Sequence, residues 1–163
     1  MTASLVASWL ALLIAAPAGL PAAVATDLKS LTDMCREAGG APVTDDAVKT
    51  VDLNGDGHAD LVLFAGNVRC DGAASLYGDR EKAITVYAGD GKGGAAQAFQ
   101  GWVFGAQLEG SGAATKLWLT VSGGACNKPP APDFASESFC DRALQWNAKA
   151  RKFEWAPVST VRM

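Results

Sequence analysis

The residues best placed to do chemistry in this sequence lie in one short segment, residues 52–60. The segment reads DLNGDGHAD. Oxygen-bearing side chains occupy its first, third, fifth and ninth positions, which are Asp52, Asn54, Asp56 and Asp60. A calcium ion in a protein takes about six to eight hard oxygen ligands in a flexible cage. The segment therefore predicts a loop that binds one Ca²⁺.

The spacing explains how a single loop could build such a cage. Alternate residues of a tight loop can point inward together, and Gly57 permits a sharp backbone turn. We expect the backbone carbonyl of His58 to add an oxygen and Asp60 to close the cage. Crowded carboxylates repel one another unless a cation is present. The alternative is a turn without metal, because Asp, Asn and Gly also favour ordinary turns.

The loop differs from an EF-hand. An EF-hand carries a bidentate glutamate at its twelfth position, which is Leu63 in this chain. Leu61–Phe64 is an apolar run typical of a strand rather than of a helix. We therefore expect the loop to join two strands.

This arrangement resembles the calcium loop of the FG-GAP and VCBS repeats. In those repeats a D-x-[DN]-x-D-G-x-x-D loop connects two strands, and a later strand ends in a glycine-rich turn before a phenylalanine. Ala83–Ala88, Gly89–Gly94 and Phe99 fit that second half, so the resemblance covers residues 48–100. The resemblance implies calcium ligation by the side chains of Asp52, Asn54, Asp56 and Asp60, and by the backbone of His58.

Two departures limit the resemblance to a single blade-like unit. Asn67–Lys82 is an insertion that carries Cys70, and residues 101–156 contain no acidic loop. A propeller needs about four or more blades. We therefore expect one unit of this type in a small protein, not a complete propeller.

The first 25 residues are typical of a secretory signal peptide. The apolar run Leu5–Ala16 is followed by prolines and a glycine, and then by the small-residue motif Ala23-Val24-Ala25. We expect cleavage after Ala25, a mature domain over residues 26–163 and a periplasmic or secreted location. An uncleaved membrane anchor is the alternative. The prolines argue against it, so we expect no stable membrane insertion after signal removal.

The chain has four cysteines, and an even number in an exported protein indicates disulfides. Metal binding by cysteine is disfavoured, because no C-x-x-C pair is present and the chain has one histidine. Three pairings are formally open. We expect Cys35–Cys70 to tie a helix to the insertion, and Cys126–Cys140 to close a proline-rich loop.

The hydrophobic pattern predicts a mainly β fold. A helix is expected over Thr26–Ala38, where Leu28, Leu31 and Cys35 share one face. Beyond it we expect antiparallel meanders of about eight strands in one sandwich-like domain. Two four-strand units are expected, near residues 48–100 and 101–156. The predicted strands are Val48–Asp52, Asp60–Ala65, Ala83–Ala88, Ala95–Gln100, Trp102–Leu108, Lys116–Val121, Ala143–Trp146 and Phe153–Trp155.

Charge and side-chain chemistry argue against two classes of function, nucleic-acid binding and catalysis by a histidine. The chain has 14 basic and 17 acidic residues, which is not the electrostatic pattern of a nucleic-acid binder. Catalysis by a histidine would have to use His58, which lies in the loop. We therefore expect an exported calcium-binding structural or binding module, not an enzyme, whose partner is an unknown protein or glycan.

Two other functions remain open from the sequence. The first is an inhibitor or ligand-binding protein that acts through the stapled loop, residues 126–140. The second is a hydrolase that uses two of the acids Asp79, Glu81, Glu109 and Glu137. The strand tryptophans Trp102, Trp118, Trp146 and Trp155 are expected in the core, with an exposed sugar-stacking face as the alternative.

Overall fold

A computed structural model describes residues 19–163. Most of the expected signal peptide, residues 1–25, therefore lies outside the described residues. The described residues form one α-helix and ten strands in three antiparallel sheets. This confirms the prediction of a mainly β fold with one N-terminal helix. Within the described residues, no helix combines the length and apolar character that a membrane span requires.

Two four-stranded meanders make up most of the structure. The first has the order β2-β3-β5-β6, with bounds Val48–Val51, Asp60–Phe64, Lys82–Gly89 and Ala95–Val103. The second has the order β10-β9-β8-β7, with bounds Lys152–Trp155, Phe139–Asn147, Lys116–Ser122 and Gly105–Glu109. The two expected units are therefore present, and each forms its own sheet.

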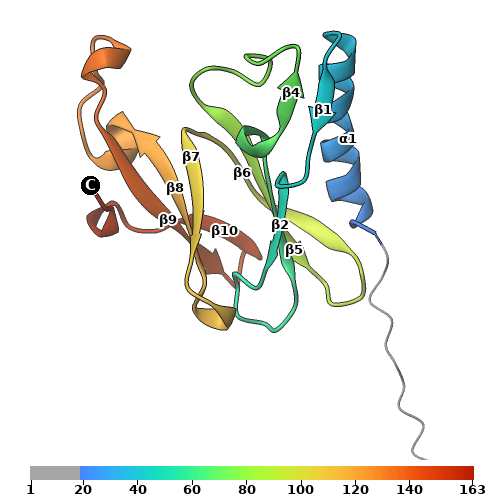
Figure 1. The fold of residues 1–163 in the computed structure, drawn as a ribbon. Coiled ribbons are helices and arrows are strands. Elements are labelled where there is room, and N and C mark those ends of the chain that lie inside the picture. Colours follow the sequence, from blue (N-terminus) through green and yellow to red (C-terminus); the bar gives the residue numbers. More distant parts are fainter. Residues whose placement is uncertain (1–18) are drawn as a thin grey trace, which may run out of the picture.

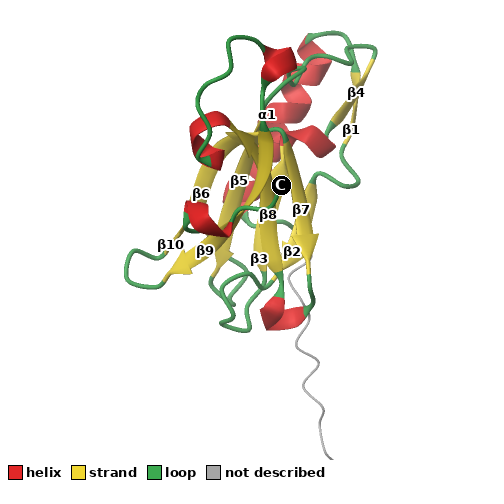
Figure 2. Ribbon diagram, turned by 90° about the vertical axis from the view of Figure 1, so that its left-hand side faces the viewer, coloured by secondary structure: helices red, strands yellow, loops and turns green. Residues whose placement is uncertain are grey.

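The two sheets pack face to face as a sandwich. Figure 1 shows β7–β10 as one layer, β2, β3, β5 and β6 as the next, and α1 outside it. Figure 2 shows the strands of both sheets running along a common direction. The core between the sheets is built from alternate strand residues, which are Val62, Phe64, Ile84, Val86, Ala98, Val103, Leu117, Leu119, Val121, Leu144 and Phe153.

The helix α1 (Ala22–Glu37) covers the outer face of the first sheet. Val24, Leu28 and Leu31 pack there in a second core, and Cys35 is buried one turn further on. The helix begins at Ala22, not at Thr26 as expected, and Pro21 occupies its N-cap position. The reason is packing: Val24 is completely buried, so the helical stripe extends one turn further toward the N-terminus.

A buried phenol joins the helix to the sheet. Tyr87 on β5 is buried, and its hydroxyl donates a hydrogen bond to the Asp27 carboxylate on α1. Burial raises the pKa of Tyr87, and the hydrogen bond to Asp27 raises it further. The phenol therefore stays protonated as a donor, which fixes the helix against the strand.

Several elements differ from the expected boundaries. The expected strand Trp102–Leu108 is divided, because the chain leaves the first sheet at Val103 and enters the second at Gly105. Two short strands were not predicted, β1 (Ala41–Val43) and β4 (Arg69–Asp71), which pair with each other. The described residues also contain short 3-10 helices at Ala65–Asn67, Gly112–Ala114, Gly123–Cys126, Phe134–Ser136 and Val158–Thr160.

Both disulfides have the expected pairing. Cys35 on α1 is bonded to Cys70 on β4, and Cys126 is bonded to Cys140 on β9. The first bond links the helix to the insertion between β3 and β5. The second closes the stapled loop, residues 126–140. These bonds are typical of a protein that folds in an oxidising compartment.

The two disulfides should differ in their effect on stability. Their sequence separations are 35 and 14 residues, and a longer closed loop restricts the unfolded chain more. Replacing both cysteines of the 35–70 pair by serine should lower the unfolding free energy by about 4 kcal/mol, against about 3 kcal/mol for the 126–140 pair. Denaturant unfolding of the two double variants measures this, and a larger loss for the 126–140 pair would contradict the entropic account.

Candidate functional site

The predicted calcium loop connects β2 to β3. It runs from Val51 to Asp60, and these two residues pair with each other at the ends of β2 and β3. Gly55 and Gly57 have φ values of 76° and 81°, which residues with side chains rarely adopt. The sequence prediction of a loop between two strands is therefore confirmed, with glycines where the backbone turns most sharply.

Asp52 organises the first half of the loop. Its Oδ1 accepts a hydrogen bond from the Gly55 amide at 2.7 Å, and its Oδ2 accepts one from the Gly57 amide at 3.0 Å. These two bonds curl the loop around the carboxylate. The side chain thus faces the inside of the loop, as a metal ligand would.

Asn54 and Asp56 contact each other. The Asp56 amide donates to Asn54 Oδ1 at 2.9 Å, and Asn54 Nδ2 donates to Asp56 Oδ2 at 3.0 Å. Asp56 Oδ1 accepts a hydrogen bond from the His58 amide at 2.8 Å. Bonds of this kind, from a backbone amide to an Asn or Asp two residues earlier, define Asx turns. The structure therefore brings these two predicted ligands together.

Asp60 has a different role at the base of the loop. It is completely buried. Its Oδ2 accepts hydrogen bonds from the amides of Leu53 at 2.9 Å and Asn54 at 3.2 Å, and its Oδ1 accepts one from the Gly89 amide at 3.1 Å. One carboxylate therefore joins the start of the loop, the start of β3 and the end of β5.

Burial raises the pKa of Asp60, and its three amide hydrogen bonds oppose that rise. The nearby charge of Asp56 also acts to raise it. The ionised carboxylate is therefore held in a place that disfavours negative charge. A cation beside the loop would favour the ionised form.

The His58 side chain contacts the neighbouring β5–β6 turn. It lies against Gly91 in the β5–β6 turn, where a Cβ atom would come within 2.5 Å of the imidazole ring. Residues 19–21, His58 and the glycines of this turn line a cavity of about 400 Å³. The one histidine of the chain is therefore a wall of this cavity.

The acids of the loop do not form a cluster of three. Among residues 19–163, no group of three or more His, Cys, Asp or Glu side chains is placed to hold a metal ion. Asp60 faces the backbone amides at the base of the loop, and one of the other predicted ligands, Asn54, is an amide. Each oxygen of Asp52 and Asp56 accepts one hydrogen bond inside the loop.

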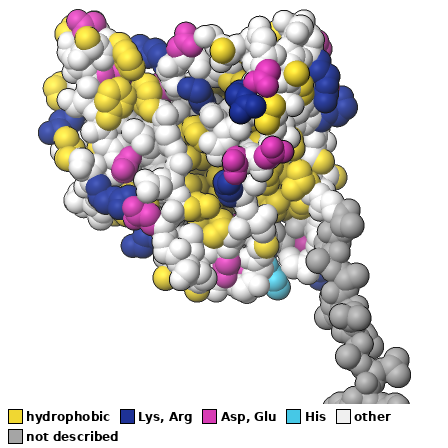
Figure 3. All heavy atoms as spheres, viewed as in Figure 1, with side chains coloured by type: hydrophobic (Ala, Val, Ile, Leu, Met, Phe, Trp, Pro, Cys, Tyr) yellow, Lys and Arg dark blue, Asp and Glu magenta, His cyan; other side chains and the backbone are white. Residues whose placement is uncertain are grey.

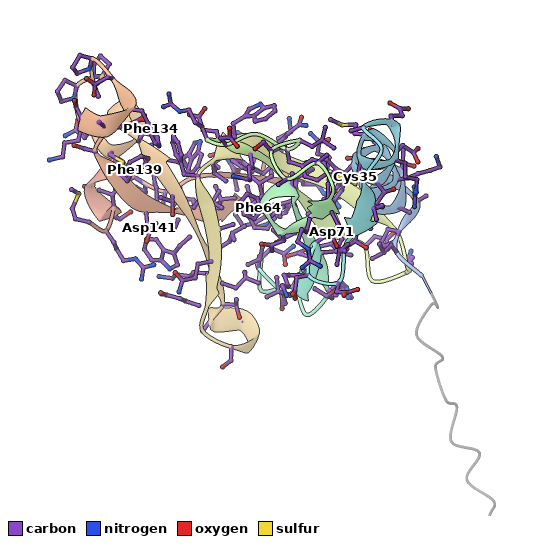
Figure 4. The ribbon with its side chains drawn as sticks, turned by 45° about the horizontal axis from the view of Figure 1, so that its top comes forward. Cys35, Phe64, Asp71, Phe134, Phe139 and Asp141 are labelled. Atoms are coloured by element: carbon purple, nitrogen blue, oxygen red, sulfur yellow. A yellow bond between two sulfur atoms is a disulfide. The ribbon has the colours of Figure 1, made fainter. Side chains whose placement is uncertain are left out.

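A second cluster, which sequence reasoning missed, lies at the stapled loop. The Arg80 guanidinium lies 4.4 Å from the Phe134 ring centroid and forms an ion pair with Glu137. Phe104 and Phe139 contact Phe134 at ring centroid distances of 6.3 and 5.9 Å. Figure 4 shows Phe134 and Phe139 far from Cys35, at the opposite side of the molecule. Arg80 and Phe104 are distant in sequence, so no local pattern could reveal the cluster.

The other candidate groups are dispersed. Trp118, Trp146 and Trp155 are partly buried. Trp102 on the edge strand β6 is 69% exposed, so the prediction that it lies in the core is wrong. Glu109 forms an ion pair with Arg162. Glu109 and Glu137 are therefore each paired with an arginine, not with a second acid.

Comparison with known proteins found no matching family model, no matching curated protein and no matching solved structure. The resemblance of residues 48–100 to FG-GAP and VCBS repeats thus remains a prediction.

Asp60→Asn should lower the unfolding free energy by about 1–3 kcal/mol. Both carboxylate oxygens of Asp60 accept amide hydrogen bonds, and an asparagine would turn an NH₂ group toward one of these donors. Asp90→Asn is the matched control. Asp90 is exposed, and its Oδ1 accepts the hydrogen bonds from both the Lys92 and the Gly94 amides, so the oxygen of an asparagine could accept both. Chemical denaturation without calcium measures both variants. Equal losses in the two would show that the Asp60 hydrogen bonds do not anchor the loop.

Proposed function

We propose that this protein is an exported structural or binding module whose β2–β3 loop binds one Ca²⁺. The proposal assigns it no catalytic residues. The observation that carries it is a single loop that brings the oxygens of Asp52, Asn54 and Asp56 into one hydrogen-bonded turn, anchored by the buried Asp60. Calcium prefers such hard oxygen ligands over nitrogen or sulfur.

The loop oxygens keep capacity for a cation. A carboxylate has about four lone-pair sites, and an amide oxygen has two. Asp52 and Asp56 each use two sites in hydrogen bonds within the loop. Each of these side chains can therefore accept a metal ion with modest movement, while the amide bonds hold the loop in shape.

Asp60 supports the proposal from the base of the loop. Its ionised form is disfavoured by burial and by the charge of Asp56. In the proposal, Ca²⁺ relieves this electrostatic cost, with Asp60 as the closing ligand and the His58 carbonyl as an additional oxygen. The His58 imidazole takes no part.

The disulfide bonds support the proposed export. The two disulfides indicate an oxidising environment outside the cytoplasm. Together with the leader sequence, they support a periplasmic or secreted location. Calcium outside cells is abundant enough to fill even weak sites, with dissociation constants of about 10⁻⁴–10⁻³ M.

A second candidate function uses the stapled loop as a surface for a protein partner. Phe134 is 49% exposed, although it stacks on Arg80 and the Cys126–Cys140 bond constrains its loop. Figure 3 shows hydrophobic side chains gathered at the upper left, over this end of the molecule. A rigid, exposed aromatic group is a common anchor in protein interfaces.

Phe134→Ala tests the second candidate. If the stapled loop binds a protein, wild type should retain that protein from a periplasmic extract, and Phe134→Ala should lose most of it. Lys149→Ala is the control, because Lys149 lies in the exposed β9–β10 turn. Equal recovery of the same protein by all three would place the interface elsewhere.

Calcium should stabilise the folded protein, because the unfolded chain has no assembled loop. The gain should be about 2.7 kcal/mol at a hundred times the dissociation constant. Asp56→Asn should lose most of the gain, because it removes one charge while its amide oxygen still accepts the His58 hydrogen bond. Thermal unfolding in EDTA and in millimolar calcium measures this.

Asp90→Asn is the matched control for that experiment. Asp90 Oδ1 accepts the Lys92 amide at 2.7 Å, in the same Asx geometry as Asp56 with His58. This variant should keep the full calcium response. Magnesium should substitute poorly, because it prefers short octahedral bonds. Identical thermal unfolding midpoints of wild type in EDTA and in calcium would contradict the calcium proposal.

A further inference from the structure

The first turn of α1 belongs to the folded domain. Val24 is completely buried and packs in the second core with Leu61 and Tyr87 of the sheet. It occupies the same helical stripe as Leu28 and Leu31, at spacings of four and three residues. A signal peptide removed after Ala25 would take this residue with it and leave its place in the core empty.

A hydrogen bond also ties Thr26 to the turn before it. The Thr26 hydroxyl donates to the Ala22 carbonyl at 2.8 Å. A cut after Ala25 would remove this acceptor. It would also place a new ammonium group at the helix N-terminus, where the helix dipole disfavours positive charge.

The residues that precede the helix contact the site region as well. Gly19, Leu20 and Pro21 form one side of the cavity whose other walls include His58 and Gly91. Of these three residues, Pro21 is half-buried and occupies the N-cap position of α1. The folded domain therefore includes the residue just before α1 as well as the first turn of the helix.

A second small-residue motif precedes Gly19 in the sequence. Ala16-Pro17-Ala18 comes at the end of the apolar run Leu5–Ala16, and small residues three and one positions before the cut define a signal peptidase site. We infer that, given the export proposed above, a signal peptidase hydrolyses the Ala18–Gly19 bond. Water adds across this bond, so that Ala18 ends the leader as a carboxylate and Gly19 becomes the amino terminus. The mature chain then keeps the whole of α1.

Mass spectrometry of the exported protein tests the inference. The full chain, with its own leader, is produced in an exporting bacterial host and recovered from the periplasm or medium. The intact mass should match residues 19–163, and N-terminal sequencing should begin at Gly19. A mass that matches residues 26–163 would overturn this inference and leave export standing. Recovery of only the uncut chain, retained in the cell, would overturn both.

Two matched variants identify the motif that the peptidase uses. Ala18→Gln places a large side chain next to the inferred bond and should abolish the Gly19 terminus. Ala25→Gln is the control, because Ala25 is exposed on the helix and glutamine is a good helix former; its product should still begin at Gly19. The reverse pattern, with processing lost only in Ala25→Gln, would assign the cut to Ala25.

Discussion

The buried carboxylate of Asp60 is the constraint on which the site depends. It accepts amide hydrogen bonds from Leu53, Asn54 and Gly89, and thereby joins the β2–β3 loop to the end of β5. A loop of Asp, Asn and Gly has little apolar surface with which to pack. Its shape therefore comes from hydrogen bonds to carboxylates, and Asp60 is the one that connects those bonds to the core.

The rest of the fold holds this anchor from two sides. The sandwich core fixes β3 and β5 on their inner faces through residues such as Val62 and Val86. The helix fixes the outer faces through Leu61 and Tyr87, and the Cys35–Cys70 bond pins the far end of the helix. The loop thus extends from a sheet that is packed on both faces, and such a support keeps the loop in a defined geometry.

Periodic and local features were predictable from the sequence. The loop, the two meanders and both disulfides follow from alternation, turn residues and cysteine position. The start of α1 was not predictable, because Ala22–Ala25 suits a helix and a signal peptide equally well, and the burial of Val24 that extends the helix depends on distant residues of the sheet. The break at Phe104 was missed for a similar reason: alternation continues while the chain passes from one sheet to the other. The Arg80–Phe134 contact joins residues far apart in sequence, which no local pattern records.

The central claim is that the loop oxygens bind calcium, and a crystal structure grown with CaCl₂ tests it most directly. The account predicts an ion with anomalous scattering, at about 2.3–2.6 Å from oxygens of Asp52, Asn54 and Asp56, with Asp60 and the His58 carbonyl completing the protein ligands. A loop that contains only water at saturating calcium, with its carboxylates still bonded to their own amides, would contradict the claim.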